Sequence, residues 1–329
     1  MLTPEVLIIA SDKNEWAKAV IGYLKEKHPK IGVELIDTAL FPQKLESRFI
    51  FNNDSVSLQL FSKDRQDTIS LENVRTIWWC EPKPPEISAT IQENEHFNFA
   101  YTECRQLLEG ISYVVDCLWV NQPERMEIAL NGLYQLQLAR IAGFKVPDTI
   151  VTNSPGIALD FWKKHQGQVV YRQLIPFPTF EDLTQESLQH IGNLEFAPLM
   201  FHEIIDCKIF FTIVVIGNGI YGVKQENKQE NEGPSTIKKC EEKDITRDLE
   251  LKILKLVKEA GLVYTQVTIG FIDPSNYIFV SMDPCEPFLE VERQTHLPLT
   301  EVFAQLLTSG KVYHSQCVWP TLSGDSKGK

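Results

Sequence analysis

Short apolar runs alternate with helical patterns from the start of this chain. Val6–Ala10 is apolar throughout, the polar pair Ser11 and Asp12 follows it, and apolar side chains between Trp16 and Leu24 then recur at helical spacing. A strand, a polar turn and a helix in this order are typical of the opening of an α/β domain. Because further strand-like runs follow at 33–36 and 74–79, we predict an α/β fold class.

Length and composition restrict the class of protein further. At 329 residues the chain is longer than one small core requires, so two or three subdomains are expected. Its content of 43% hydrophobic and 23% charged residues is typical of a soluble globular protein. The formal net charge of −12 argues against sequence-independent binding to nucleic acid, which draws on clustered lysine and arginine.

No segment has the features of a membrane helix or an export signal. The longest apolar runs, such as 209–216, fall well short of the roughly 20 residues that span a bilayer. The N-terminus lacks a basic stretch and leads directly into the first strand, so we predict no signal peptide and a cytoplasmic location. Seven scattered cysteines without a C-x-x-C pair predict neither a disulfide framework nor a zinc site.

Periodicity and turn residues predict the elements of the first part of the chain. The expected elements are a hairpin over 49–61, helices over 94–110, 125–142 and 157–164, and strands over 149–152 and 169–172. The second of these helices is expected to end at Gly143, with Pro147 beyond it.

The remaining residues predict a second sheet with helices and one polar break. Expected are strands over 196–205 and 208–222, a helix over 248–260, a hairpin of 264–272 with 277–282, and a last helix over 299–307. The stretch 222–246 is dominated by charged and amide side chains, so we predict a mobile surface loop there.

The strand that ends at Pro284 carries two polar side chains, Ser281 and Asp283, spaced two residues apart. Residues at i and i+2 of a strand point to the same face, so this pair presents its oxygens at one place. The pair is therefore a candidate binding element.

The order of several short motifs resembles one superfamily. They are Trp119-Val-Asn121-x-Pro123, Gln135-Leu136, Val146-Pro147-x-Thr149, Val169-Val-Tyr-Arg172, Phe201-His-Glu203 and the hairpin that ends in Pro284. This ordered set resembles the ATP-grasp superfamily, and most of all the microviridin-type, or graspetide, peptide ligases. The resemblance implies an ATP-grasp fold: an N-terminal α/β pre-ATP-grasp domain over 1–118, followed by two α+β subdomains over 119–195 and 196–329.

The resemblance also implies ATP and magnesium as cofactors, with their binding residues. Arg172 falls at a phosphate-binding position, where a guanidinium can contact phosphate. The backbone of Glu203, Ile204 and Ile205 falls where the family binds adenine. Asp283 falls at a metal position, where one carboxylate oxygen can hold a hydrated ion. In this family the metal stabilises charge while a carboxylate forms an acyl phosphate, which a hydroxyl or amine then displaces.

Four positions depart from the family pattern. Gly132 stands in place of a phosphate-binding lysine, and Thr212 in place of an arginine that contacts the substrate or acyl phosphate. Thr268 replaces an aspartate, and Ser281 replaces a metal-binding glutamate. Neutral hydroxyls are poor magnesium ligands, so the expected catalytic charges are missing from this set.

Two functional hypotheses follow. The first is a catalytically impaired ATP-grasp protein, a pseudoenzyme that binds a peptide or protein partner in peptide (RiPP) modification. The alternative is an active ATP-dependent carboxylate–amine or carboxylate–hydroxyl ligase, a peptide macrocyclase that uses Arg172 and Asp283 in a rearranged metal site. In either case the resemblance implies a peptide or protein partner, with a homodimer or a complex with an active ligase as forms of association.

Overall fold

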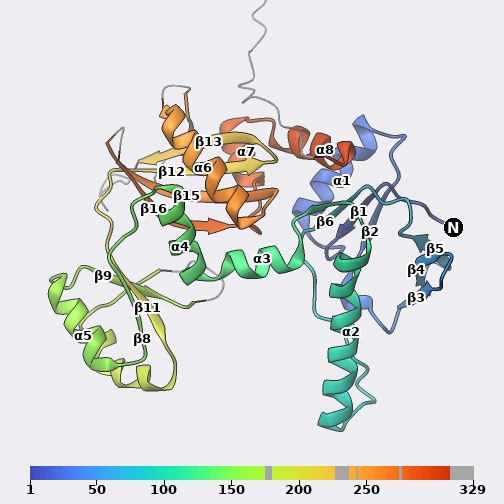
Figure 1. Ribbon diagram of the computed structural model, residues 1–329, viewed down its shortest axis with the longest axis horizontal. Coiled ribbons are helices and arrows are strands. Elements are labelled where there is room, and N and C mark those ends of the chain that lie inside the picture. Colours follow the sequence, from blue (N-terminus) through green and yellow to red (C-terminus); the bar gives the residue numbers. More distant parts are fainter. Residues whose placement is uncertain (175–179, 227–236, 242–243, 274–275, 312–329) are drawn as a thin grey trace, which may run out of the picture.

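The computed structural model describes residues 1–174, 180–226, 237–241, 244–273 and 276–311. Figure 1 shows an N-terminal domain with the long helix α2 (Asn94–Val114), a central subdomain that carries α5 (Pro155–Lys164), and a C-terminal subdomain around α6 (Arg247–Ala260). Within these described ranges, no helix is both long and apolar enough to cross a membrane. The α/β class predicted from the sequence is confirmed.

A parallel sheet of four strands forms the centre of the N-terminal domain, in the order β2-β1-β6-β7. Its apolar runs are buried because helices cover a parallel sheet on both faces. Val6 pairs with Val33 on one side and with Thr76 on the other. The elements are β1 (Val6–Ile9), α1 (Glu15–Lys27), β2 (Val33–Ile36), η1 (Thr38–Leu40), β6 (Thr76–Trp79), α2 and β7 (Leu118–Val120).

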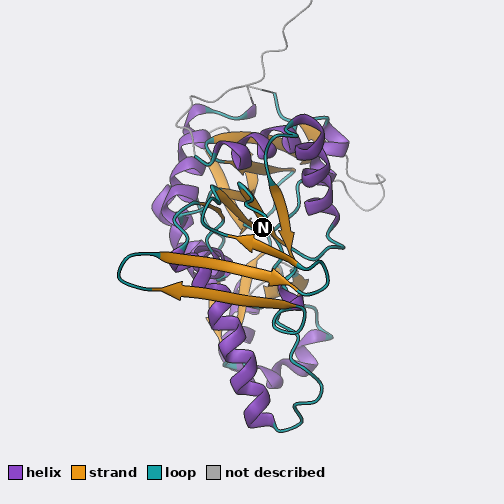
Figure 2. Ribbon diagram, turned by 90° about the vertical axis from the view of Figure 1, so that its right-hand side faces the viewer, coloured by secondary structure: helices purple, strands orange, loops and turns teal. Residues whose placement is uncertain are grey.

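The predicted hairpin over 49–61 is part of a small antiparallel sheet beside this domain, and the view in Figure 2 brings its long strand pair to the front. Asn52 closes the turn because its Oδ1 accepts hydrogen bonds from the backbone amides of Asp54 and Ser55, at 2.9 and 2.8 Å. The strands are β3 (Leu45–Phe51), β4 (Val56–Ser62) and β5 (Asp67–Ser70).

The helix expected over 125–142 is in fact two helices, α3 (Pro123–Leu130) and α4 (Gly132–Ala142). Asn131 lies between them in an extended conformation, and its Oδ1 accepts from the amides of Leu133 and Tyr134 at 3.0 and 3.3 Å. Asparagine is a preferred N-terminal cap, and this cap ends the continuous helix that apolar periodicity predicted.

The central subdomain is a four-stranded antiparallel sheet in the order β10-β9-β11-β8. The strand expected to open the second sheet at 196–205 belongs here instead, since Phe201 pairs with Ile150 and with Tyr171. The change of sheet therefore follows Glu203. The elements are β8 (Thr149–Thr152), α5, β9 (Val169–Arg172), β10 (Glu181–Asp182), η2 (Ser187–Phe196) and β11 (Leu199–Glu203).

The C-terminal subdomain is an antiparallel sheet in the order β14-β13-β12-β15-β16, with α4 and α6 packed on one face. The mobile loop expected over 222–246 differs at its ends, where β13 continues to Glu226 and Ile237–Lys239 pairs with it. Residues 227–236 and 242–243 of that segment lie outside the described residues. The elements are β12 (Ile209–Ile216), β13 (Gly219–Glu226), β14 (Ile237–Lys239), α6, β15 (Tyr264–Asp273), β16 (Asn276–Asp283), α7 (Leu289–Thr295) and α8 (Leu299–Ser309).

The last helix returns to the N-terminal domain. α8 packs on α1 and β6, where the Phe303 ring lies 4.8 Å from that of Trp78 and 5.8 Å from that of Trp16. Tyr264 of β15 joins the same cluster, with 5.2 Å between its ring and that of Trp16. One apolar core thus joins α1 to α8, and it fixes the N-terminal domain against the C-terminal sheet.

Candidate functional site

Two buried amide side chains hold β16 on either side of Asp283. Asn121 Nδ2 donates to the carbonyl of Tyr264 at 2.9 Å and lies 3.5 Å from that of Pro284, while its Oδ1 accepts from the amide of Tyr264 at 2.9 Å. Gln135 Nε2 donates to the carbonyl of Met282 at 2.7 Å. Because both partners are backbone groups, Asn121 and Gln135 position the strand and leave its side chains free to vary.

Three of the substituted positions form one row across the C-terminal sheet. Thr212 of β12 pairs with Thr268 of β15, and Thr268 pairs with Ser281 of β16. Directly opposed residues of neighbouring strands lie on the same face, with Cβ atoms about 5 Å apart. All three are half-buried. The row therefore presents three neutral hydroxyls, and no charged side chain, on one face of the sheet.

Asp283 lies in the next row, opposite Gln266. Its Oδ1 accepts a hydrogen bond from the backbone amide of Cys285 at 2.7 Å. Burial raises the pKa of this carboxyl, and the amides of Cys285 and Glu286 oppose that effect. Among the described residues, no group of three or more histidine, cysteine, aspartate or glutamate side chains is placed to hold a metal ion. The only acid on this strand end is thus occupied in closing a turn.

Arg172, at the end of β9, is buried, with 6% of its surface exposed. Its Nε donates to His202 Nε2 at 3.2 Å, and the ring of Phe180 lies 5.3 Å from its guanidinium carbon. Among the described residues, Nη2 has no hydrogen-bond partner. Burial lowers the pKa of this guanidinium. A buried cation with a free donor is a place where an anion would be stabilised.

The hydrogen bonds around His202 determine its tautomer. Because Nε2 accepts from Arg172, Nδ1 carries the proton and donates to Thr149 Oγ1 at 2.9 Å, which in turn donates to the carbonyl of Pro147 at 2.8 Å. Burial and then the charge of Arg172 lower the pKa of His202 to about 3. His202 is therefore neutral and orients Arg172, a role that the spacing of histidines in the sequence did not indicate.

In the linker between the two sheets, the backbone amide of Glu203 donates to the carbonyl of Asp148 at 3.0 Å. Glu203 Oε1 accepts from the amide of Asp148 at 2.9 Å, and the amide of Ile204 donates to the carbonyl of Gln168 at 3.0 Å. Of the three residues predicted to meet adenine, Ile205 alone has an amide without a partner among the described residues. A ligand between the sheets would find one donor here.

Solved structures resemble this chain over more than nine-tenths of its length. The macrocyclase MdnC of Microcystis aeruginosa, bound with the precursor peptide MdnA, matches 94% of this chain and 100% of its own at 20% identity, with a TM-score of 0.81. An ATP-grasp ligase of Chryseobacterium gregarium, in complex with ADP and a leader and core peptide, matches 97% and 100% at 20% identity, with a TM-score of 0.80.

The chain has the ATP-grasp ligase fold. The ligase PsnB, complexed with a minimal precursor, Mg and ADP, agrees with this at a TM-score of 0.76 and 18% identity, over 94% of this chain and 98% of its own. No protein-family model matches the chain, and no curated protein is significantly similar to it.

This ATP-grasp fold separates the residues predicted to bind cofactors into two groups. Arg172 and the Glu203–Ile205 linker belong to the central subdomain and to its exit, whereas Asp283 ends a strand of the C-terminal sheet. The structure adds His202 to the first group, because it accepts a hydrogen bond from Arg172, and it places Gly132 there too, since a Cβ atom at that position would lie 3.2 Å from Arg172 Nη2. A pattern within the sequence could not have found these contacts, since they join residues 30 and 40 positions apart.

Proposed function

We propose that this chain is a peptide-binding protein of the ATP-grasp fold that has lost magnesium-dependent ligase chemistry. The observation that carries the proposal is the hydroxyl row of Thr212, Thr268 and Ser281. The family places an arginine, an aspartate and a glutamate at these three positions. Hydroxyls neither neutralise a phosphate nor bind magnesium as carboxylates do.

Peptide binding is supported by the proteins that this chain resembles. MdnC is bound with a precursor peptide, and the Chryseobacterium ligase with a leader and a core peptide. Both align with this chain over their full length, so peptide-bound proteins of the same fold support this proposal. We propose a peptide of the RiPP class as the ligand, and association with an active ligase as the way in which binding contributes to modification.

A second candidate is a working ATP-dependent ligase with a rearranged metal site. The free Nη2 of Arg172 favours it, because a phosphate oxygen would satisfy a buried donor that the described residues leave unpaired. In that case Asp283 would bind the metal, and the Ile205 amide would bind the base.

Measurements of nucleotide binding with and without magnesium distinguish the peptide-binding protein from the working ligase. We expect no magnesium-dependent shift of the melting temperature at millimolar ATP, and no ADP formed on incubation with ATP, magnesium and peptide. A magnesium-dependent shift that Asp283→Ala abolishes would establish the second candidate. A shift that needs no magnesium and disappears in Arg172→Ala would mean that phosphate binding has survived without catalysis, as the first proposal permits.

A further inference from the structure

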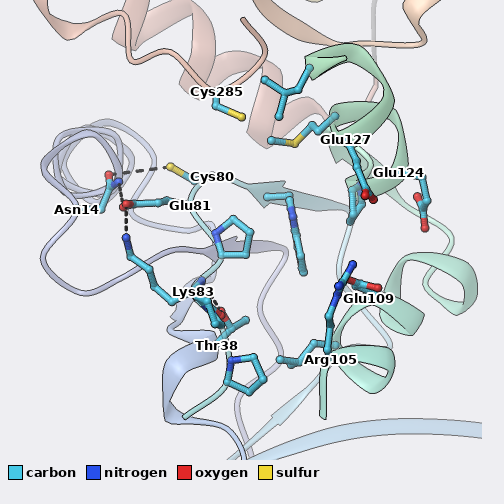
Figure 3. Close-up of a pocket in the computed structure, with 18 of the residues that line it drawn as sticks. Asn14, Thr38, Cys80, Glu81, Lys83, Arg105, Glu109, Glu124, Glu127 and Cys285 are labelled. Carbon is cyan, nitrogen blue, oxygen red and sulfur yellow. Dashed lines mark hydrogen bonds and ion pairs between the residues drawn. The ribbon is translucent and has the colours of Figure 1, made fainter. Parts of the chain in front are cut away.

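A cavity of about 790 Å³ lies between the N-terminal domain, α3 and the segment that follows β16 (Figure 3). We call it the interdomain pocket. Most of its lining comes from residues 79–85 at the end of β6, from α2, from α3 and from residues 283–287, and Asn14, Trp16 and Thr38 complete it. Of the described residues that line it, only Asp283 belongs to the candidate site above. The pocket thus adjoins the candidate site at Asp283 and is otherwise lined by different residues.

The interdomain pocket carries an excess of negative charge. Six carboxylates and two cations line it: Glu81, Glu109, Glu124, Glu127, Asp283 and Glu286, with Lys83 and Arg105. Both cations are already paired, Lys83 with Glu81 and Arg105 Nε with Glu109 Oε1 at 2.5 Å. Among the described residues, the other four carboxylates form no ion pair. Four carboxyl groups are therefore left without an ion-pair partner, and burial raises the pKa of two of them, Asp283 and Glu286.

The arrangement of these charges favours an organic cation over a metal ion. The acids are spread over several walls, with Glu124 and Glu127 on one side of Figure 3 and Glu81 on the other. No cluster among the described residues is tight enough to hold a metal ion. Apolar side chains such as those of Trp79 and Met126 form the walls between these acids. A long side chain with methylene groups and a charged end matches such a space.

A second observation indicates a peptide. Trp16 also lines the interdomain pocket, is 3% exposed, and its indole Nε1–H has no acceptor among the described residues. A buried donor without a partner costs stability until an acceptor reaches it. A peptide brings carbonyl oxygens to this wall together with its side chains, whereas a metal ion or a simple amine brings none. Because Nε1 itself is shielded from solvent, a hydrogen bond to such a carbonyl requires the Trp16 side chain to turn toward the pocket.

We propose that the interdomain pocket binds a lysine or arginine side chain of the peptide ligand. Its carboxylates face the cationic end, and the wall around Trp79 and Met126 packs on the methylene groups. The inference rests on the proposed function, because it specifies which residue type of the bound peptide enters the protein. The side chain proposed to enter this pocket is therefore positively charged, whereas a substrate that offers a carboxylate would bring a negative charge.

Selection from a random peptide display library on the full-length protein tests this. We expect selected peptides to be enriched in lysine and arginine, and a resynthesised peptide to bind about tenfold more weakly in the Glu127→Lys variant. Glu103→Lys is the matched control, since Glu103 is an exposed acid of α2 that does not line the pocket and its change alters net charge equally. Replacing the key lysine or arginine of the peptide by norleucine should weaken binding similarly.

The outcomes are distinguishable. Selected peptides without basic enrichment, or with affinities that Glu127→Lys leaves unchanged, overturn the pocket assignment while peptide binding stands. Equal losses in Glu103→Lys and Glu127→Lys also overturn it, because they indicate attraction by net charge alone. The absence of any selected peptide overturns peptide binding and the pocket assignment together, independently of the nucleotide experiments.

Discussion

The Nη2 atom of Arg172 lies 3.2 Å from the point where a Cβ atom on Gly132 would sit. Met200 Cε lies even closer to that point, at 2.9 Å. The guanidinium and the methionine thus occupy the space that a side chain at position 132 would need. Gly132 and Arg172, the two positions at which the sequence comparison predicts phosphate contacts, are therefore structurally linked.

Restoring a lysine at position 132 is expected to destabilise the protein. Gly132→Lys forces a side chain into a packed space and sets an ammonium beside the guanidinium of Arg172, at a cost of about 2 kcal/mol in the free energy of unfolding. In the Arg172→Ala background the same change should cost about 1 kcal/mol less, because the guanidinium no longer fills the space and no longer repels the ammonium. Urea unfolding of the four proteins measures this coupling.

Gly22 in α1 provides the control, because a Cβ there would meet nothing within 4 Å. Gly22→Lys should leave stability unchanged or raise it by up to about 1 kcal/mol through helix propensity. Strictly additive effects of Gly132→Lys and Arg172→Ala would show that the two positions are independent.

His202 should make the protein sensitive to acid. Its pKa is lowered from 6.5 to about 3, so between these values the unfolded chain binds a proton that the folded protein does not. Stability is then fully present above about pH 6.5 and is lost as pH falls. At pH 5 the loss from this group is about 2 kcal/mol. His202→Gln keeps an acceptor for Arg172 without titrating, so urea unfolding should show a smaller loss between pH 7 and pH 5.

His190 is exposed and serves as the comparison. His190→Gln should leave the dependence of stability on pH as it is in the natural protein. If His202→Gln loses as much stability as the natural protein on acidification, His202 is not buried in the neutral form.

Local patterns predicted the elements of this fold more reliably than their partners. The hairpin of β15 and β16 was legible because apolar residues alternate on either side of a polar turn. The break at Asn131 was missed, since apolar periodicity continues across it and only the cap reveals it. Apolar runs alone place β11 in the wrong sheet, because the residues of β8 and β9 with which it pairs precede it by 28 positions or more.

In the candidate site, too, local features are predictable from the sequence, whereas contacts between distant strands are not. Alternation in β16 placed Ser281 and Asp283 on one face from sequence alone. That Thr212 and Thr268 continue the row requires the register of three strands, which no local pattern specifies. No local pattern indicates the interdomain pocket, because its walls come from six segments between residues 14 and 287.

Two carboxylates introduced into the hydroxyl row of Thr212, Thr268 and Ser281 should create a magnesium site. Thr268→Asp with Ser281→Glu would place two carboxylates on directly opposed residues, about 5 Å apart at Cβ. Without metal the two like charges should lower the melting temperature. Millimolar magnesium should then raise it by several degrees, because the ion binds the folded protein alone. The natural protein should show no such rise.

Thr268→Asn with Ser281→Gln is the matched control, since it has the same shapes without charge. It should respond to magnesium no more than the natural protein does. An equal response of both double variants would mean that the added ion acts on the protein elsewhere.

Asn121 should be among the most sensitive positions of the fold. Asn121→Ala removes the acceptor of the Val263 and Tyr264 amides, at 2.7 and 2.9 Å, and the donor to the Tyr264 carbonyl. We expect a loss of about 3 kcal/mol in unfolding free energy, because buried backbone groups are left unpaired. Asn193→Ala, at an exposed asparagine, should cost little. A small loss at Asn121 would show that water replaces these hydrogen bonds.

Asp283 should oppose folding at neutral pH. Burial raises the pKa of its carboxyl, so the folded protein holds the proton more tightly than the unfolded chain does. Stability therefore falls as pH rises from the ordinary aspartate pKa of about 3.9 through the raised value, and the loss persists at pH 7. Asp283→Asn retains an oxygen for the Cys285 amide and loses the charge, so it should raise the melting temperature by a few degrees at pH 7 and by nothing near pH 3.

Asp116→Asn, at an exposed aspartate, should change neither value. A drop at pH 7 in Asp283→Asn would mean instead that the carboxylate has a cationic partner in the folded protein.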